Sequence, residues 1–365
     1  MKEIKIRGRK MQLPAFLPDA TFGKIKGIDD SEDLVKCKLD GLVVNTYHLF
    51  KENLIHGNKG IKQSGGIHNF MNLNDKIIIS DSGGFQVMSI IHTNSKNGKI
   101  NDDGAVFLLD GKKVELTPEK CIQFQLDIGS DIVMCLDDCT YPDMSNEEQE
   151  ISVKRTIDWA KRCRKEFDKL TKNIEEGDKP FIFGIIQGGN NLELRKKCAD
   201  KLIDIGFDGY AFGGWPAEDG KFLHSILKYT CELMPENKLK YAMGVGKPED
   251  IFYCVSIGYN MFDCVIPTRE ARNNRLYAFK KNIFGKMKKI KERNNFYEYV
   301  RIRNSNYIGD KKLISKFCDC ECCTKYSRSD IYKLFKEKNR ESVRLATMHN
   351  LRFYSMLMER LRNIY

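Results

Sequence analysis

The sequence predicts an α/β fold: a (β/α)8 barrel of the TIM type with an inserted or C-terminal zinc-binding subdomain. Short apolar runs alternate with stretches of helical periodicity, which is typical of a parallel α/β fold. Polar or glycine residues follow nearly every run, and four cysteines cluster near the C-terminal end. The 365 residues are 41% apolar and 30% charged, a globular balance. A single barrel of this kind uses about 250 residues.

The expected elements follow one another in the order that a barrel requires. Seven strands are predicted at residues 41–44, 76–79, 131–136, 180–186, 209–212, 240–243 and 261–263, with a weaker eighth at 15–17. Helices are predicted at 118–126 after the cap Thr117, at 146–169 after Ser145, and at 192–205 and 221–233. A further helical pattern covers 328–362. A doubly wound open sheet is the competing fold, but no G-x-G-x-x-G follows the first strand.

The residues just past the predicted strands are the first indication of a site. They are Asn45, Asp81, Asp137 with Asp138, Gln187, Gly213 with Gly214, Gly244 and Asp263. In a parallel barrel the carboxyl ends of the strands meet on one face, where active sites of this architecture are built. Each residue alone could be a turn or a helix cap. Together they predict one pocket lined by acids, a glutamine and glycines.

The positive charge is concentrated in one stretch. The net charge is +11, and residues 271–316 contain fourteen Lys and Arg against three acids, so the rest of the chain is neutral. Aromatic residues are interleaved with this charge, which indicates a polyanion-binding surface with nucleic acid as the leading partner. A solvated lysine-rich face is the alternative. We expect residues 1–270 to form the barrel and residues 271–365 a basic, zinc-binding region that completes its outer layer.

Thirteen cysteines are too few for a disulfide scaffold in a chain of this length, and most stand alone among apolar residues. Reduced thiols and a cytoplasmic location are therefore expected. No run of eighteen apolar residues occurs, and the first twelve residues are highly charged. We expect no membrane span and no secretion signal.

A metal site is predicted at the cysteine cluster. The proposed ligands are Cys318, Cys320, Cys323 and His349, with Cys322 as the spare thiol. Three thiolates and one imidazole complete a tetrahedral zinc sphere and leave no open position for water, so a single Zn²⁺ here would be structural. The spacing is not the common paired C-x-x-C arrangement, and reduced cysteines are the alternative.

Two carboxylates point to the chemistry. Asp81 ends one predicted strand before a pair of glycines, and Asp263 ends another with Arg269 and Arg272 behind it. Two acids facing one pocket suit displacement at a sugar carbon, one as nucleophile and the other as proton shuttle.

These motifs resemble the tRNA-guanine transglycosylase family of the bacterial type, almost from end to end. The matching stretches are NTYHL (45–49), SDSGGFQ (80–86), DIVMCLDDC (131–139), GIIQGG (184–189), GYAFGG (209–214), MGVGKPED (243–250), FDCVIPTREAR (262–272) and the C-x-C-x-x-C with its distant histidine. The family exchanges the wobble guanine of GUN-anticodon tRNAs for a 7-deazaguanine base by double displacement. The resemblance supports both the barrel and the zinc predictions.

The resemblance also implies roles for individual residues. Asp263 would attack the ribose C1′ to form a covalent ribosyl-enzyme, and Asp81 would be the general acid/base. The substituted base would be bound by Ser82, Gly83, Gly84, Phe85, Gln86, Asp137, Gln187, Gly213, Gly214 and Met243. The anticodon loop would contact Gly244, Val245, Gly246, Lys247, Pro248, Glu249, Asp250, Thr268, Arg269, Glu270, Ala271 and Arg272. The family commonly forms homodimers near its zinc-bearing part.

One loop departs from the family pattern. After Gly214 a small aliphatic run is usual, whereas this chain has Trp215, Pro216, Ala217, Glu218 and Asp219. The loop borders the 7-substituent of the incoming base, so queuine and 7-aminomethyl-7-deazaguanine both stay open, as does a repacked loop of ordinary specificity. A DNA-modifying relative and a non-catalytic partner subunit are the alternative functions, and the presence of both acids argues against the second.

Overall fold

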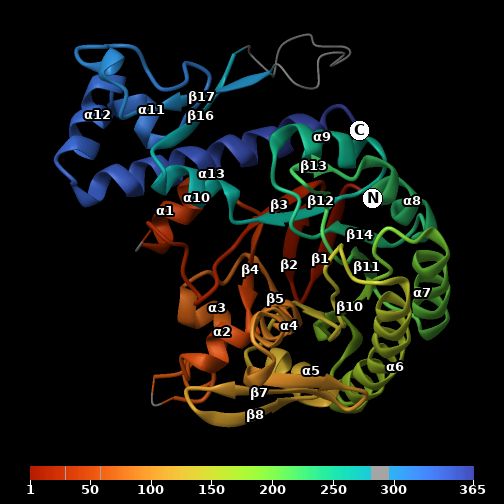
Figure 1. Ribbon diagram of the computed structural model, residues 1–365. Helices are drawn as coiled ribbons and strands as arrows, with labels where there is room; N and C mark the ends of the chain where they lie inside the picture. The colour runs from red at the N-terminus through yellow and green to blue at the C-terminus, as the bar shows by residue number, and fades with distance from the viewer. Residues whose placement is uncertain (29, 58, 281–295) are drawn as a thin grey trace.

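The computed structural model describes residues 1–28, 30–57, 59–280 and 296–365 (Figure 1). Residues 281–295, which include part of the predicted basic stretch, lie outside the described residues. The charge prediction can therefore be followed only on the two sides of that segment.

One sheet forms the centre of the molecule (Figure 1). Its strands are β3 (Ala15–Pro18), β4 (Gly41–Asn45), β5 (Ile77–Asp81), β9 (Ile132–Met134), β10 (Phe181–Ile186), β11 (Gly209–Phe212), β14 (Leu239–Ala242) and β15 (Met261–Cys264). They pair in parallel in the order β3-β15-β14-β11-β10-β9-β5-β4. An isolated bridge joins Asp19 to Val43, so β3 returns to β4 and the barrel nearly closes. This confirms the predicted fold class, and all eight predicted strands are present.

Helices alternate with these strands along the chain and surround them. They are α1 (Ser31–Lys36), α2 (Thr46–Lys51), α3 (Ile67–Met71), α4 (Gly84–Thr93), α5 (Pro118–Asp127), α6 (Asn146–Thr171), α7 (Leu192–Ile205), α8 (His224–Leu233), α9 (Pro248–Ser256) and α10 (Ile266–Arg272). Thr117 caps α5 as predicted, and Ser145 forms a capping box at the start of α6. The part of the chain that the structure describes has no helix long and apolar enough to cross a membrane.

The helix predicted at 221–233 is wrong at its start. Lys221–Phe222 form strand β13, which pairs antiparallel with β12 (Ala217–Glu218), and α8 begins only at His224. The turn between the two short strands places Asp219 and Gly220 at positive φ, +48° and +74°. Glycine adopts this conformation without strain and Asp tolerates it, which favours a tight turn over a helix.

The barrel interior is apolar and is closed at the amino ends of its strands. Its lining comes from alternate strand positions, because successive side chains of a strand point to opposite faces. The hairpin of β1 (Glu3–Ile6) and β2 (Arg9–Gln12) adds Ile4, Ile6, Met11 and Leu13 to the same cluster. The opposite end, at the carboxyl ends of the strands, is where the interior becomes polar.

Further elements decorate the barrel. A three-stranded sheet of β6 (Gly98–Asn101), β7 (Gly104–Leu109) and β8 (Lys112–Leu116) lies between α4 and α5 in the chain. The C-terminal region contains β16 (Arg275–Phe279), β17 (Tyr297–Arg301), α11 (Glu321–Lys325), α12 (Arg328–Lys336) and α13 (Arg340–Arg362). The single helical pattern predicted over 328–362 is thus two helices. Lys338 at φ +54° ends the first, and the Asn339 side chain caps the second.

Helix α13 joins the C-terminal region to the barrel. It packs against α10, α9, α1 and strand β3. Buried side chains of the barrel wall such as Phe16 and Phe262 belong to the same hydrophobic cluster as Tyr354 of α13. The described residues of this region, 271–280 and 296–365, therefore share a core with the barrel.

Candidate active site and metal centre

The polar residues of the barrel face one rim. Leu17, Ile79, Ile185, Tyr241 and Met261 point into the apolar interior. Two positions further along the same strands, where the side chain again points inward, stand Asp19, Asp81, Gln187, Met243 and Asp263, and Asn45 and Gly213 follow Val43 and Ala211 in the same way. The structure thus brings residues from separate strand ends to one end of the barrel.

Asp81 and Asp263 lie on nearby strands of this rim. Only β3 and β4 separate their strands in the closed sheet. The Asn45 amide donates to a carboxylate oxygen of Asp81 at 2.7 Å, and the backbone N–H of Gly244 donates to Asp263 at 2.9 Å. Each acid is therefore held in place by a neighbouring strand end, and both remain partly exposed.

Both acids have raised pKa values. Burial and, to a lesser extent, the charge of Asp263 raise the pKa of Asp81 to about 6, against the opposing effect of the N–H groups of Gly83 and Ser82. Burial also raises the pKa of Asp263 to about 6, although the Gly244 N–H and the Tyr241 hydroxyl favour its charged form. Two interacting carboxyls of this kind retain a proton more readily than isolated ones near neutral pH. One acid can then act as a nucleophile while the other holds a proton.

Asp137 and Gln187 form a second polar pair. The Gln187 amide donates to Asp137 at 2.6 Å, and burial raises the pKa of Asp137 to about 7. The Gln187 Oε1 atom is buried and has no hydrogen-bond partner among the described residues. A Cβ on Gly213 would lie only 2.6 Å from Gln187 Nε2, so a residue without a side chain is required beside this amide. Asp138, predicted at the same strand end, instead pairs with Arg155.

The turn after β5 supplies the other residues predicted to bind the base. Gly83 caps α4 at φ +80°, where a Cβ would lie 2.8 Å from the Cβ of Tyr47. Ser82 and Gly84 are buried beside it. Phe85, which follows Gly84 at the start of α4, is 38% exposed. Gln86 has a buried Oε1 atom with no partner among the described residues.

An aromatic cluster stands beside Phe85. The Trp215 ring meets Phe85 edge-on at 5.4 Å between centroids and stacks on Tyr141 at 5.7 Å. The Trp215 Nε1 atom is buried with no partner among the described residues. The hairpin β12–β13 that follows is fixed by a hydrogen bond from Asn190 to Glu218. The loop that departs from the family pattern therefore forms an ordered aromatic wall next to Phe85.

The residues predicted to contact RNA differ in exposure. Gly244, Lys247, Arg269 and Arg272 are exposed, and Glu249 is partly exposed and accepts a hydrogen bond from the Tyr297 hydroxyl at 2.7 Å. The others are buried: Val245, Gly246, Pro248, Asp250, Thr268, Glu270 and Ala271. The buried residues can support the conformation of these two segments, whereas the exposed residues are available to contact a ligand.

The predicted metal ligands lie together. The ligand atoms of Cys318, Cys320, Cys323 and His349 are all within 4.8 Å of one another, and all four residues are buried. His349 Nδ1 is 3.4 Å from Cys320 Sγ and 3.3 Å from Cys323 Sγ, while its Nε2 is bonded to the Tyr277 carbonyl. That second contact fixes the ring so that Nδ1 faces the thiols. Cys322 is buried outside the group, so these residues fit one metal ion with a closed coordination sphere.

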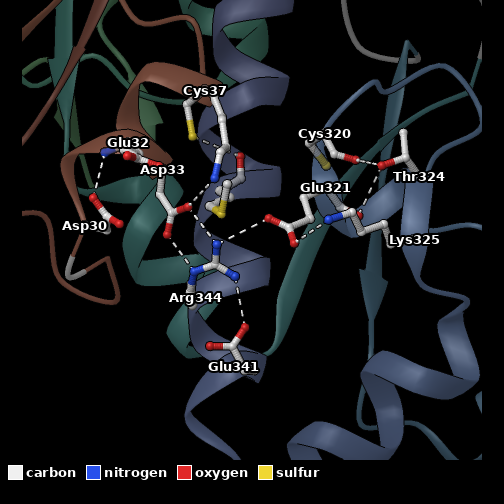
Figure 2. Close-up of polar contacts among 12 residues, drawn as sticks. Asp30, Glu32, Asp33, Cys37, Cys320, Glu321, Thr324, Lys325, Glu341 and Arg344 are labelled. Carbon is white, nitrogen blue, oxygen red and sulfur yellow. Dashed lines mark hydrogen bonds and ion pairs between the residues drawn. The ribbon is translucent and has the colours of Figure 1, made fainter.

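Ion pairs attach this centre to its surroundings. Figure 2 shows Arg344 of α13 between Asp33 of α1 and Glu321 of α11, with N–O distances of 2.5 Å and 3.2 Å. Asp319, within the cysteine cluster, pairs with Arg352 at 2.5 Å and with Lys38 at 2.8 Å. The metal-binding loop is thereby fixed to α13 and to the first helix of the barrel.

Two residues of the rim were missed by the sequence analysis. Asp19 follows β3, whose run was read as a weak strand, so the residue beyond it was not considered. Arg195 is 1% exposed and donates to the carbonyls of Ile186, Gly189 and Gly213. The sequence does not indicate that this arginine is buried, because charged residues of an amphipathic helix are usually exposed. Arg195 braces the ends of β10 and β11, which carry Gln187 and the two glycines.

Comparisons with known proteins agree with this geometry. The family model described as queuine tRNA-ribosyltransferase matches residues 1–364. A queuine tRNA-ribosyltransferase of Psychrobacter sp. (strain PRwf-1) is 41% identical over 99% of this chain and 88% of its own length. One from Mannheimia succiniciproducens is 41% identical over 96% of this chain and 85% of its own length. The resemblance inferred from the motifs is confirmed, and the chain belongs to the queuine tRNA-ribosyltransferase family.

Proposed function

We propose that this chain is a pentosyltransferase that exchanges the wobble guanine of GUN-anticodon tRNAs for a 7-deazaguanine base. The observation that supports this most is the pair of partly exposed acids with raised pKa values, Asp81 and Asp263, at one barrel rim with the Asp137–Gln187 pair. Family membership supplies tRNA and the base as substrates.

The reaction would proceed by two displacements at C1′ of the ribose. The Asp263 carboxylate attacks C1′ as the bond to guanine breaks, and a proton held by Asp81 neutralises the leaving base. A covalent ribosyl-Asp263 intermediate keeps the tRNA in place. The incoming base then loses a proton to Asp81 and attacks C1′, which releases Asp263. Two inversions give net retention of configuration.

The base would be held by polar groups that still have hydrogen-bond acceptors without a partner. Asp137 and the unpartnered Gln187 Oε1 can accept from the N–H edge of a guanine-like ring, and the backbone at Gly214 lies beside them. Phe85 and Met243 would cover the two faces of the ring. A base that cannot satisfy these buried groups is rejected, because it leaves them unpaired.

The aromatic wall bears on which base is inserted. Trp215 has a buried N–H without a partner among the described residues, and its ring and that of Tyr141 are stacked. An ammonium group is attracted by aromatic faces, whereas a hydroxyl can accept from the indole N–H. Either 7-aminomethyl-7-deazaguanine or queuine is therefore the incoming base, and offering both to the enzyme decides between them.

The remaining assignments concern the rest of the chain. We infer that the Cys3His group holds one structural Zn²⁺, since thiolates and imidazole suit that ion and four ligands close its sphere. The exposed Lys247, Arg269 and Arg272 would meet the anticodon loop, next to the basic region. We also propose a barrel unit over 1–270, a C-terminal unit over 271–365, a homodimer, and a cytoplasmic location in keeping with thirteen free cysteines.

The test is the exchange of labelled guanine. Purified protein should incorporate label into tRNA with a GUN anticodon and not into duplex DNA of matched size. Incorporation into DNA alone would favour the DNA-modifying alternative. No incorporation into either, with intact folding and metal content, would favour a non-catalytic subunit.

A further inference from the structure

Asp19 is a third acid of the rim, between the other two. It follows β3, which lies between the Asp263 strand β15 and the Asn45 strand β4 in the closed sheet. In the register of β15 with β3, Asp263 lies opposite Leu17. Asp19 comes two residues after Leu17, toward the carboxyl end of the barrel, and its side chain is on the same inward-facing side. Its side chain is partly exposed.

The Asp19 carboxylate has hydrogen-bonding capacity to spare. The Thr21 hydroxyl lies 2.8 Å and 2.6 Å from its two oxygens, but a hydroxyl has a single hydrogen to donate. A carboxylate offers about four acceptor positions. The Thr21 backbone N–H also donates to this carboxylate, and acceptor positions still remain without a partner among the described residues.

Several titratable groups influence Asp19 or are influenced by it. His48 and Lys26 favour its ionised form, although burial raises its pKa. Asp19 in turn raises the pKa of Asp81 and of Asp263, and it stabilises the charge of Arg272. These charge effects agree with the position of Asp19 on the strand between those of Asp263 and Asn45.

The position of Asp19 relative to the base site indicates which part of a nucleotide it meets. Gln187 follows β10, which stands four strands away from β3 and therefore on the opposite side of the eight-stranded barrel. A nucleotide whose base lies against Gln187 and Asp137 extends its sugar toward β15, β3 and β5. Asp19 then faces the sugar, beside the carboxylate that attacks C1′.

We propose that Asp19 accepts a hydrogen bond from the ribose 2′-hydroxyl of the nucleotide under attack, and so selects RNA over DNA. This inference rests on the proposed function. Within a polynucleotide the 3′ and 5′ oxygens are phosphodiesters, so the 2′-hydroxyl is the one sugar hydroxyl that can donate. A carboxylate repels the phosphates but accepts from that hydroxyl. When the nucleotide carries a deoxyribose, the Asp19 carboxylate would lose its bound water and gain no hydrogen-bond donor in exchange.

The experiment compares two anticodon-loop hairpins that differ only in guanosine or 2′-deoxyguanosine at the exchanged position. Guanine exchange is measured as kcat/KM for the wild type, Asp19→Ala and Asp19→Asn. A hydrogen bond to a charged group should give the wild type about a 10- to 100-fold preference for the ribonucleotide hairpin. Asp19→Ala should reduce the preference to less than about threefold, chiefly by loss on the ribonucleotide hairpin. Asp19→Asn, which keeps an acceptor oxygen, should fall between.

Each outcome has a distinct meaning. An equal loss on both hairpins in Asp19→Ala, which leaves the wild-type ratio of the two rates unchanged, would overturn the role of Asp19 and leave the proposed function standing. No exchange by the wild type on the ribonucleotide hairpin would overturn the proposed function itself. The intrinsic reactivity of the deoxyribose cancels in the comparison of variants. Asp204→Ala, which removes an exposed acid on α7, is the matched control and should keep the full preference.

Discussion

The barrel rim and the metal centre use buried polar groups in opposite ways. At the rim, Asp81, Asp263 and Asp137 have pKa values raised to about 6, 6 and 7 by burial, and Gln187 keeps an unpartnered oxygen. At the metal centre, thiols and imidazole face one another, and Asp319 is paired with Arg352 and Lys38. Arginine hydrogen bonds keep the pKa of Asp319 low despite its partial burial.

This difference separates binding from stability. On the proposed function, the rim groups receive the substrate, and they are left incompletely satisfied, which costs folding free energy until the substrate arrives. Groups that only hold the chain together are matched by partners from within it. Substitutions at the rim should therefore damage activity and spare the fold, while substitutions at the metal centre should do the reverse.

The largest effect is expected from loss of a metal ligand. Cys323→Ser, or treatment with a chelator, should release the metal and destabilise the C-terminal region, because a structural zinc ion is worth on the order of 10 kcal/mol. Elemental analysis and thermal unfolding measure this. Cys322→Ser is the control, since this thiol is buried nearby but outside the ligand group, and it should retain the metal. Protein without zinc whose unfolding is unchanged by the chelator would refute the assignment.

Asp263→Asn is expected to have the next largest effect. An amide does not act as the nucleophile, so guanine exchange should fall by about 10⁴-fold or more and the covalent enzyme–RNA adduct should disappear. Denaturing gel electrophoresis detects the adduct. Zinc content and unfolding temperature should stay close to those of the wild type. An adduct that persists in this variant would remove Asp263 from its role.

A smaller effect is expected on the pH dependence of the free energy of unfolding when Asp81 is replaced. Its folded pKa, about 6, lies above the ordinary value of 3.8, so the folded state holds the proton more tightly. The free energy of unfolding therefore falls as pH rises from about 4 to 6, by up to about 3 kcal/mol. Asp81→Asn should remove this dependence and stabilise the protein at pH 8, with no gain at pH 4. Urea unfolding at both pH values measures it.

Asp319→Asn provides the contrasting control from the metal centre. Its folded pKa is lowered, so its charge stabilises the fold above the ordinary pKa and the benefit is lost as pH falls. This substitution should destabilise the protein at pH 8 and have little effect at low pH. The same sign for both substitutions would contradict the division between rim and metal centre.

The sequence was sufficient for the regular parts of this molecule. Most residues of the barrel strands are apolar and buried, and the acids Asp81 and Asp263 were singled out because they stand where such runs end. The Cys3His group was predicted because four cysteines stand together ahead of a helical pattern that carries His349, and the structure brings these side chains together. Thr117 and Ser145 marked their helices because side-chain caps are local interactions.

Features that depend on tertiary position were not predictable. The place of Asp19 on the rim depends on the closed sheet, which brings β3 between β15 and β4, and no local pattern encodes that. The helical pattern of the sequence does not show that Arg195 is buried, yet in the fold its guanidinium donates hydrogen bonds to three backbone carbonyls. The hairpin after Trp215 replaced a predicted helical turn because Asp219 and Gly220 adopt positive φ. The break before α13 depends on the same conformation at Lys338.

The smallest effect is expected at the junction of the two regions, where Arg344 contacts Asp33, Glu321 and Glu341 (Figure 2). Burial opposes ionisation of Asp33, but the hydrogen bonds and charge of Arg344 outweigh it and lower the pKa of that carboxyl. Arg344→Ala should cost about 1–2 kcal/mol of unfolding free energy, less than a fully isolated buried charge would, because Lys36 still lies 3.3 Å from Asp33. Urea unfolding gives the value, and Glu341→Ala, which removes only an exposed partner, should change the free energy of unfolding by less than about 0.5 kcal/mol.

Metal content and guanine exchange should be unchanged in both variants, since Arg344 touches neither the ligand atoms nor the rim. Loss of metal in Arg344→Ala would mean that the junction supports the metal centre directly, and the separation between the two regions would have to be redrawn.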